Sequence, residues 1–80
     1  MSKKENYDRV FIESFSINEN KLGDKLVYNS IPEWDSIGHM QMIAELEDVF
    51  EIEFEMDDII NFSSYRKGIE ILEKYEVEIK

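Results

Sequence analysis

The sequence has no cysteine, no long hydrophobic run and little positive charge. The absence of cysteine excludes a disulfide framework, a thiolate metal site and a cysteine nucleophile. Any sulfur chemistry must therefore come from a group that the chain acquires. Nowhere do more than three apolar residues stand together, which excludes a transmembrane helix because such a helix needs about 20 of them.

The scarcity of positive charge restricts the partners. There are 9 Lys and Arg against 19 Asp and Glu, so the formal net charge is −10. We expect neither nucleic acid nor an anionic membrane surface as a partner, because both are bound through clustered positive charge. The N-terminal residues 1–9 are highly charged and precede no apolar stretch of signal-peptide length, so we expect a cytoplasmic protein.

The length and the apolar content predict one folded domain, residues 1–80. A chain of 80 residues holds a single small core, and 42% hydrophobic residues are too many for a disordered chain. Apolar residues recur at helical spacing, and the predicted helices span residues 4–16, 36–51, 57–62 and 64–75, the third of them short. The expected fold is all-α, a monomeric bundle of three main helices and one short helix. An α+β domain that uses the alternating tail as a strand is the rival.

The helix predicted over residues 36–51 has two apolar faces. The face expected to point into the core consists of Met42, Ile43, Leu46, Val49 and Phe50. His39, the only histidine, lies in the same arc, and we expect it to be packed rather than free for proton transfer. Ile37, Met40 and Ala44 lie on the opposite side among carboxylates, which is typical of a docking surface. Alternatively, Ile37 packs under the long connection and Met40 against the short helix.

The negative charge is concentrated in one part of the chain. Residues 36–62 contain eight acidic residues and no basic one, whereas residues 63–80 contain four of each. Like charges at helical spacing destabilise a helix, so this concentration suggests a use, such as steering a basic partner onto the helix. The alternative is a solvated acidic face that maintains solubility.

Ser36 is the residue most suited to carry chemistry. Asp35 directly precedes the predicted helix and is its natural N-cap. Ser36 then opens the helix, and a phosphate ester on its hydroxyl would face unpaired backbone N–H groups and the positive end of the helix dipole. The position suits a phosphorylated or phosphodiester-linked serine, although an ordinary helix start is the simpler reading.

The residues around Ser36 carry a recognisable pattern. The run WDSIGHM at residues 34–40 is followed by MIAELE at residues 42–47 and by Phe50. This pattern resembles the acyl carrier protein family, whose attachment signature is Asp-Ser-Leu at the start of the second helix. The resemblance extends over most of the chain, through a first amphipathic helix, a long loop, the acidic second helix, and a last helix reached through Phe62, Ser63 and Ser64.

The resemblance implies that Ser36 accepts 4′-phosphopantetheine from coenzyme A. A separate, basic, Mg²⁺-dependent phosphopantetheinyl transferase would perform the reaction and contact Asp35. The thiol of the arm would hold an acyl or aminoacyl group as a thioester and present it to loading and transferring enzymes with basic docking patches. The chain itself would be a non-catalytic carrier without a metal site. The resemblance places the docking surface on Ile37, Met40, Gln41, Ala44, Glu47 and Asp48.

The sequence departs from the family pattern near Ser36, and these departures bear on which acyl group the chain would carry. Many fatty-acid carriers have Asp-Ser-Leu-Asp where this chain has DSIG at residues 35–38, and Gln41 replaces an acidic residue. Together with Trp34 and His39, this is similar to the stand-alone carriers of specialised pathways. Fatty acyl, short acyl and aminoacyl cargo all remain open. An apolar chain would have to enter the bundle between residues Ile43, Leu46, Phe50, Ile59 and Phe62.

A competing interpretation from a different class is an unmodified acidic adaptor domain that binds a basic protein through helix 36–51. An enzyme is not expected, because no carboxylate pair is accompanied by a Gly-rich phosphate loop or a metal-spaced histidine cluster. Asp57 and Asp58 also lack the alternating ligands of a calcium loop.

Overall fold

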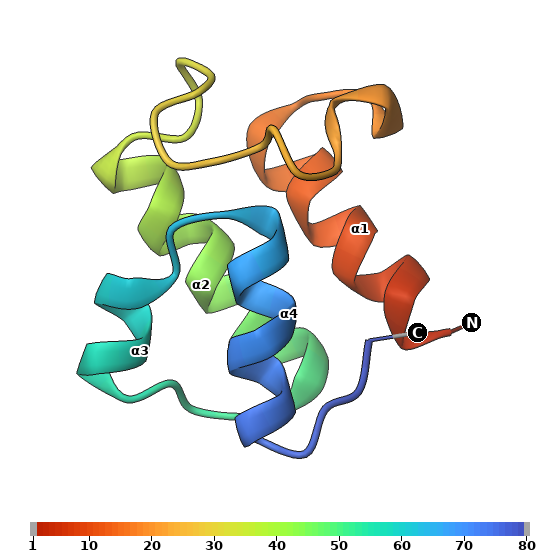
Figure 1. Cartoon of the computed structure of the whole chain (residues 1–80), viewed down its shortest axis with the longest axis vertical. Coiled ribbons are helices and arrows are strands. Elements are labelled where there is room, and N and C mark those ends of the chain that lie inside the picture. Colours follow the sequence, from red (N-terminus) through yellow and green to blue (C-terminus); the bar gives the residue numbers. More distant parts are fainter. Residues whose placement is uncertain (1, 80) are drawn as a thin grey trace.

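The computed structural model describes residues 2–79 and has an all-α fold (Figure 1). Its elements in chain order are α1 (Lys3–Phe15), the 3-10 turn η1 (Glu19–Lys21), α2 (Ser36–Phe50), α3 (Met56–Asn61) and α4 (Tyr65–Lys74). Each of the four helices begins and ends within one residue of its predicted bounds. Within residues 2–79, strand-like pairing is limited to one isolated bridge between Val27 and Ser64. The α+β alternative is therefore wrong.

Local signals in the sequence define the ends of these helices. The Ser2 hydroxyl accepts from the Glu5 N–H at 3.1 Å and opens α1, and the Ser64 hydroxyl accepts from the Lys67 N–H at 2.9 Å and opens α4. Such caps satisfy N–H groups that have no partner inside a helix. At their C-terminal ends, α1 and α2 stop at left-handed residues, Ser16 and Glu51.

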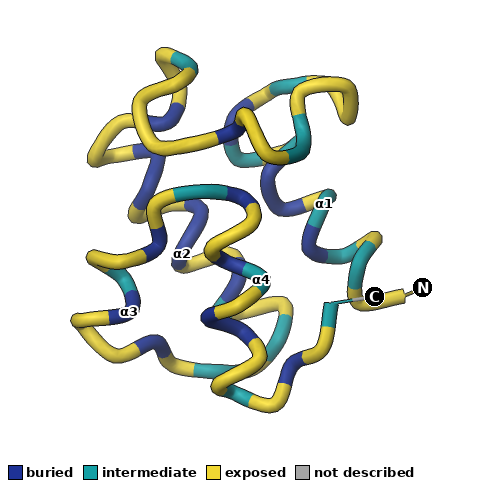
Figure 2. The backbone as a smooth tube through the Cα atoms, viewed as in Figure 1, coloured by how far each residue is buried: buried dark blue, intermediate teal, exposed yellow. Residues whose placement is uncertain are grey.

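The core is an aromatic cluster between α1, α2 and α4. Figure 2 shows buried residues on the faces of these helices that turn inward. The aromatic side chains that are buried there are Tyr7, Phe11, Phe15, Trp34, Phe54, Phe62 and Tyr65. The predicted core face of α2 is confirmed for Met42, Ile43 and Leu46, but Phe50 is only partly buried and Val49 is 39% exposed. Assigning Val49 to the core was wrong because it lies at the edge of the arc, where the neighbouring elements no longer cover it.

The long connection between α1 and α2 crosses one end of the bundle (Figure 1). It is attached to the start of α4 by two backbone hydrogen bonds. The Tyr28 N–H donates to the Ser63 carbonyl and the Tyr65 N–H donates to the Leu26 carbonyl, both at 2.9 Å. Leu26 is buried. These bonds place the segment just before α2 beside the junction of α3 and α4.

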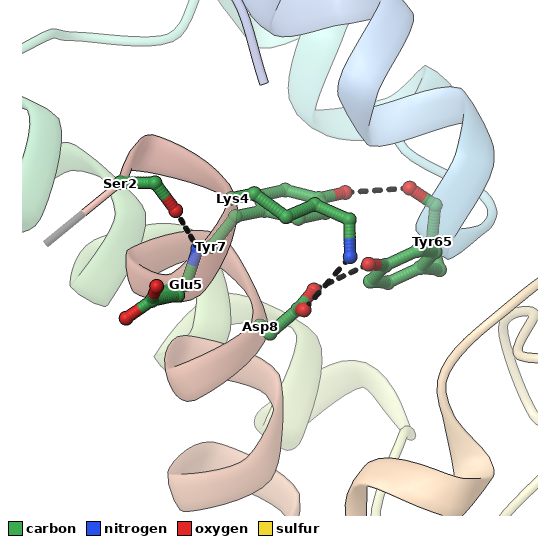
Figure 3. Close-up of polar contacts among 6 residues, drawn as sticks. All are labelled: Ser2, Lys4, Glu5, Tyr7, Asp8 and Tyr65. Carbon is green, nitrogen blue, oxygen red and sulfur yellow. Dashed lines mark hydrogen bonds and ion pairs between the residues drawn. The ribbon is translucent and has the colours of Figure 1, made fainter. Parts of the chain in front are cut away.

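A second set of polar contacts joins α1 to α4 (Figure 3). The Tyr7 hydroxyl donates to the Tyr65 carbonyl at 2.6 Å, the Tyr65 hydroxyl donates to the Asp8 carboxylate, and Lys4 forms an ion pair with the same carboxylate at 2.9 Å. Burial raises the pKa of the Tyr7 hydroxyl well above its ordinary value. The hydroxyl therefore stays protonated and able to donate at physiological pH.

The short helix α3 is held to α4 by the buried carboxylate of Asp58. Its two oxygens accept from the Lys74 ammonium at 2.6 Å and from the Tyr75 hydroxyl at 2.5 Å. The Tyr75 hydroxyl also accepts from the Glu55 N–H at 2.9 Å. The hydrogen bonds from Lys74 and Tyr75 lower the pKa of Asp58. A helix of six residues is not stable alone, so these contacts determine where α3 lies.

Replacement of Asp58 by asparagine is expected to lower the melting temperature by roughly 4–8 °C at pH 7. Because the folded-state pKa of Asp58 is lowered, its stabilisation is complete above the unfolded pKa of about 4 and is lost as the pH falls through the folded pKa. The difference in melting temperature between wild type and Asp58→Asn should therefore shrink below about pH 4. Thermal unfolding followed by circular dichroism from pH 7 to pH 3 measures this difference. Asp57→Asn, an exposed neighbour on α3, is the control, and an equal loss in both variants would contradict the role of Asp58.

Candidate functional site

Ser36 is the first residue of α2 and its side chain is exposed. Asp35 is the N-cap, as expected from the sequence, and its Oδ1 accepts from the Gly38 N–H at 2.8 Å. The Asp35 carbonyl also accepts from the His39 N–H at 2.8 Å. The cap leaves the Ser36 hydroxyl at the positive end of the helix, where a negatively charged substituent is favoured.

Gly38 lies where the connection before α2 turns closely over the helix. A Cβ atom built on Gly38 would come within 2.0 Å of the Glu33 carbonyl oxygen and 3.2 Å of its carbon. These contacts involve backbone atoms, so a side chain here would force the turn and the helix apart. Glycine at this position therefore allows the turn to lie against the start of α2.

An apolar groove of about 410 Å³ begins beside Ser36 and runs between α2 and α3. Its size is within the range of small-molecule sites, which is about 300 to 1,000 Å³. The lining residues are Tyr28, Ser36, His39, Met40, Met56, Ile59, Ile60, Phe62 and Ser63. Of the five residues between which an apolar chain was expected to enter the bundle, Ile59 and Phe62 line the groove. Ile43 and Leu46 are buried, and Phe50 is partly buried.

His39 forms part of the groove and is held at both ring nitrogens. The Trp34 Nε1–H donates to His39 Nδ1 at 2.9 Å, so Nδ1 is the acceptor nitrogen and the ring proton lies on Nε2. His39 Nε2 then donates to the Ile59 carbonyl at 2.8 Å. The expectation that His39 is packed is confirmed, since it is 9% exposed. Trp34 is completely buried, and its contacts with Phe15 and His39 pack the connection against α1 and α2.

The hydrogen bonds of His39 were not apparent from the sequence. A single histidine in the apolar arc of a helix indicated that the ring is packed. It did not indicate which groups form hydrogen bonds with the ring. Trp34 precedes His39 by five residues across a helix start, which is a spacing with no regular geometry. Ile59 lies 20 residues later on another helix. Only the folding of α3 against α2 brings its carbonyl to the ring.

The predicted docking residues form one exposed stripe along α2, with one partial exception. Ile37 is 71% and Met40 51% exposed, and Gln41, Ala44 and Asp48 are exposed as well. The alternative in which Ile37 is packed under the connection is therefore wrong. Met40 lines the groove while remaining half exposed. Glu47 is only partly exposed because its Oε2 accepts from the Phe54 N–H at 2.9 Å, which fixes the chain after α2.

Of the eight acidic residues of the segment 36–62, two have structural roles and the other six are exposed. Asp58 is buried against Lys74, and Glu47 is partly used to hold a backbone N–H. The exposed carboxylates on and beside α2 are Glu45, Asp48 and Glu51. The negative surface along the docking stripe is therefore smaller than the sequence count suggests, and Asp48 is its free carboxylate.

Residues 2–79 contain no cluster of three His, Asp or Glu side chains arranged to hold a metal ion. No helix in the part of the chain that the structure describes is long and apolar enough to cross a membrane. The described geometry is thus an exposed serine at a helix start, an apolar groove beside it and an exposed stripe on the same helix. No family model, curated protein or solved structure matches the chain in sequence or fold comparisons.

Proposed function

We propose that this chain is a carrier protein that bears 4′-phosphopantetheine on Ser36 and presents an acyl group to partner enzymes. The observation that carries this proposal is the position of Ser36, which is exposed at the N-terminus of α2 and lies at the edge of an apolar groove. The sequence around Ser36 resembles the attachment signature of acyl carrier proteins. Both lines of argument lead to the same residue.

The surroundings of Ser36 fit a phosphodiester. The helix start supplies backbone N–H groups without partners inside the helix and a positive dipole end, which stabilise a phosphate anion. Attachment would form a bond between the Ser36 Oγ and a phosphorus of coenzyme A, while the adenosine bisphosphate portion leaves and the serine proton passes to a base. The terminal thiol of the attached group would supply the sulfur that the cysteine-free chain lacks.

We propose that the base for this step comes from a partner enzyme, because the side chains beside Ser36 already have structural roles. Its only histidine uses both ring nitrogens, for Trp34 and for the Ile59 carbonyl. The Asp35 carboxylate accepts from the Gly38 N–H. In this proposal the base and the metal belong to a separate phosphopantetheinyl transferase, and the chain is a non-catalytic, cytoplasmic carrier.

Gly38 departs from the Asp-Ser-Leu-Asp pattern of many fatty-acid carriers for a structural reason. The Glu33 carbonyl occupies the space that a side chain at position 38 would need. The departure therefore follows from a tight turn before α2 and does not argue against attachment at Ser36. It does remove one carboxylate that a transferase would contact in those carriers.

The proposal is tested by incubating the purified chain with coenzyme A, Mg²⁺ and a broad-specificity phosphopantetheinyl transferase, followed by intact-mass measurement. The expected result is a gain of one phosphopantetheinyl group. An unchanged mass would overturn the proposal and would favour the second candidate, an unmodified acidic adaptor that binds a basic protein. The exposed Ile37 and Met40 beside Asp48 are the observation that favours such an adaptor.

Charge reversal on the docking stripe is expected to slow the modification. Asp48→Lys removes the free carboxylate of the stripe, and electrostatic steering of a basic transferase should weaken, so we expect a rate roughly two- to tenfold lower at low ionic strength. The difference should diminish near 0.5 M salt because screening shortens the range of the interaction. Asp48 is preferred to Glu47, because reversing Glu47 would also break its bond to the Phe54 N–H.

Glu70→Lys is the matched control for this experiment, since Glu70 is exposed on α4 and the variant has the same net charge as Asp48→Lys. Time courses of mass gain at several salt concentrations measure both variants. Equal rates for the two variants at low salt would show that the stripe does not steer the transferase.

A further inference from the structure

The groove beside Ser36 offers an apolar surface without charge. None of its lining residues is acidic or basic, apart from the histidine whose ring nitrogens are both in hydrogen bonds. Met56 and Ile60 on α3 are largely exposed, at 71% and 70%. Apolar side chains this exposed gain free energy when another apolar group covers them. A cationic group in the groove would find no carboxylate partner there and would lose hydration.

The floor of the groove is closed by two layers of aromatic rings. The first layer consists of His39 and Phe62, which line the groove, are nearly fully buried and contact each other at a centroid distance of 6.1 Å. Behind them lie Trp34, stacked on His39 at 6.2 Å, and Phe11, stacked on Phe62 at 6.2 Å. Since interiors are close-packed, the groove cannot extend into the core without displacing these rings.

The hydrogen bond from His39 to the Ile59 carbonyl also ties the two walls of the groove together. It joins α2 to α3 at 2.8 Å, and the Asp58 contacts tie α3 to the end of α4. If α3 moved away to widen the groove, the Ile59 carbonyl and the His39 ring would both lose a partner in a poorly solvated place, which is costly. The groove is therefore limited in depth as well as in width.

We propose that the cargo held on the Ser36 arm is a short, uncharged, apolar acyl group, and that His39 sets its size limit by closing the floor of the groove. This inference rests on the proposed carrier function and deepens it. The aromatic floor keeps a long fatty acyl chain out of the core, so such a chain would have to lie along the open side of the groove. An aminoacyl group of the same size would bring an ammonium group, and no lining residue of the groove is a carboxylate that could pair with it.

The test uses three acyl groups loaded on wild-type protein as acyl-phosphopantetheine: 4-methylpentanoyl, leucyl and dodecanoyl. The first two have the same carbon skeleton and differ in the amino group. The measured quantity is the rate of thioester cleavage by hydroxylamine, divided by the rate for the same acyl group on free pantetheine. This ratio removes the intrinsic reactivity of each thioester and requires no partner enzyme.

We expect 4-methylpentanoyl to be cleaved roughly fivefold more slowly on the protein than on free pantetheine, because partial burial shields the thioester. Leucyl should show a ratio near one, and dodecanoyl should be protected no more than 4-methylpentanoyl. Strong additional protection of dodecanoyl would overturn the size limit. Equal protection of leucyl and 4-methylpentanoyl would overturn the preference for uncharged cargo.

Two sets of variants test the residues involved. Ile60→Ser on the groove wall should reduce protection of 4-methylpentanoyl, whereas Val49→Ser, at the other end of α2 and outside the groove, should not. His39→Ala should increase protection of dodecanoyl by opening the floor. His39→Asn is used alongside it, because its amide can still accept from Trp34 and preserve the fold, which circular dichroism verifies. Unchanged dodecanoyl protection in the folded His39 variant would overturn the role of His39.

These outcomes are distinguishable from a failure of the proposed function. A chain that no transferase modifies carries no thioester, and that result contradicts the carrier proposal itself. A chain that is modified at Ser36 but leaves every acyl group as reactive as on free pantetheine contradicts only the cargo inference.

Discussion

Substitution of Ser36 by alanine is expected to abolish modification by a phosphopantetheinyl transferase, with no mass gain even after a reaction time that fully converts the wild type. The hydroxyl is the nucleophile of the proposed step, and alanine leaves no oxygen to form the ester. Because Ser36 is exposed and Asp35 provides the cap, the fold should be unaffected. Surface substitutions of this kind usually change stability by no more than about 0.5 kcal/mol.

Ser63→Ala is the control that makes this result specific. Ser63 is also exposed and lines the same groove, but it lies before the N-cap of α4, whereas Ser36 lies after the N-cap of α2. The Ser63→Ala variant should be modified as fast as the wild type. Full modification of the Ser36→Ala variant, or loss of modification in both variants, would show that the attachment site had been assigned incorrectly.

Replacement of Trp34 by alanine is expected to lower the free energy of unfolding by about 3–5 kcal/mol. Trp34 is completely buried and stacks between Phe15 and His39, so its removal leaves a large cavity. It also leaves the His39 Nδ1 without its donor. The total free energy of unfolding of a small domain is only about 5–15 kcal/mol. The variant should therefore be close to unfolded at 37 °C.

Trp34→Phe separates the two contributions. Phenylalanine fills part of the cavity but cannot donate a hydrogen bond to His39. The free energy of unfolding of this variant should therefore be roughly 1–3 kcal/mol lower than that of the wild type. Urea unfolding followed by circular dichroism is the suitable measurement, because Trp34 is the only tryptophan and both variants lose its fluorescence. A loss below about 1 kcal/mol for Trp34→Ala would mean that the loop before α2 is not anchored by this ring.

The helices were predictable from the sequence because their signals are local. Ser2, Asp35 and Ser64 precede apolar residues at helical spacing, and each of these side chains accepts from a backbone N–H three residues later. Asp35 is the local signal that marks Ser36 as the first residue of a helix, so the position of this candidate residue was predictable as well. Helical spacing also separated the exposed Ile37 and Met40 from the buried Leu46.

Errors arose where the answer depended on contacts between distant segments. Val49 has core spacing on α2 but lies beyond the area that other elements cover. The acidic residues also looked alike in sequence, although Asp58 is buried against Lys74 and Asp48 is exposed.

The sequence by itself determined the helices, the acidic character of α2 and the serine at its start, because periodicity, charge and capping act over a few residues. Only the tertiary structure decided what lies beside that serine. The groove requires α3 to be held against α2 by His39 and Ile59 and against α4 by Asp58. These residues are 16 to 20 positions apart, and no local rule specifies which side chains meet when a chain folds over such distances.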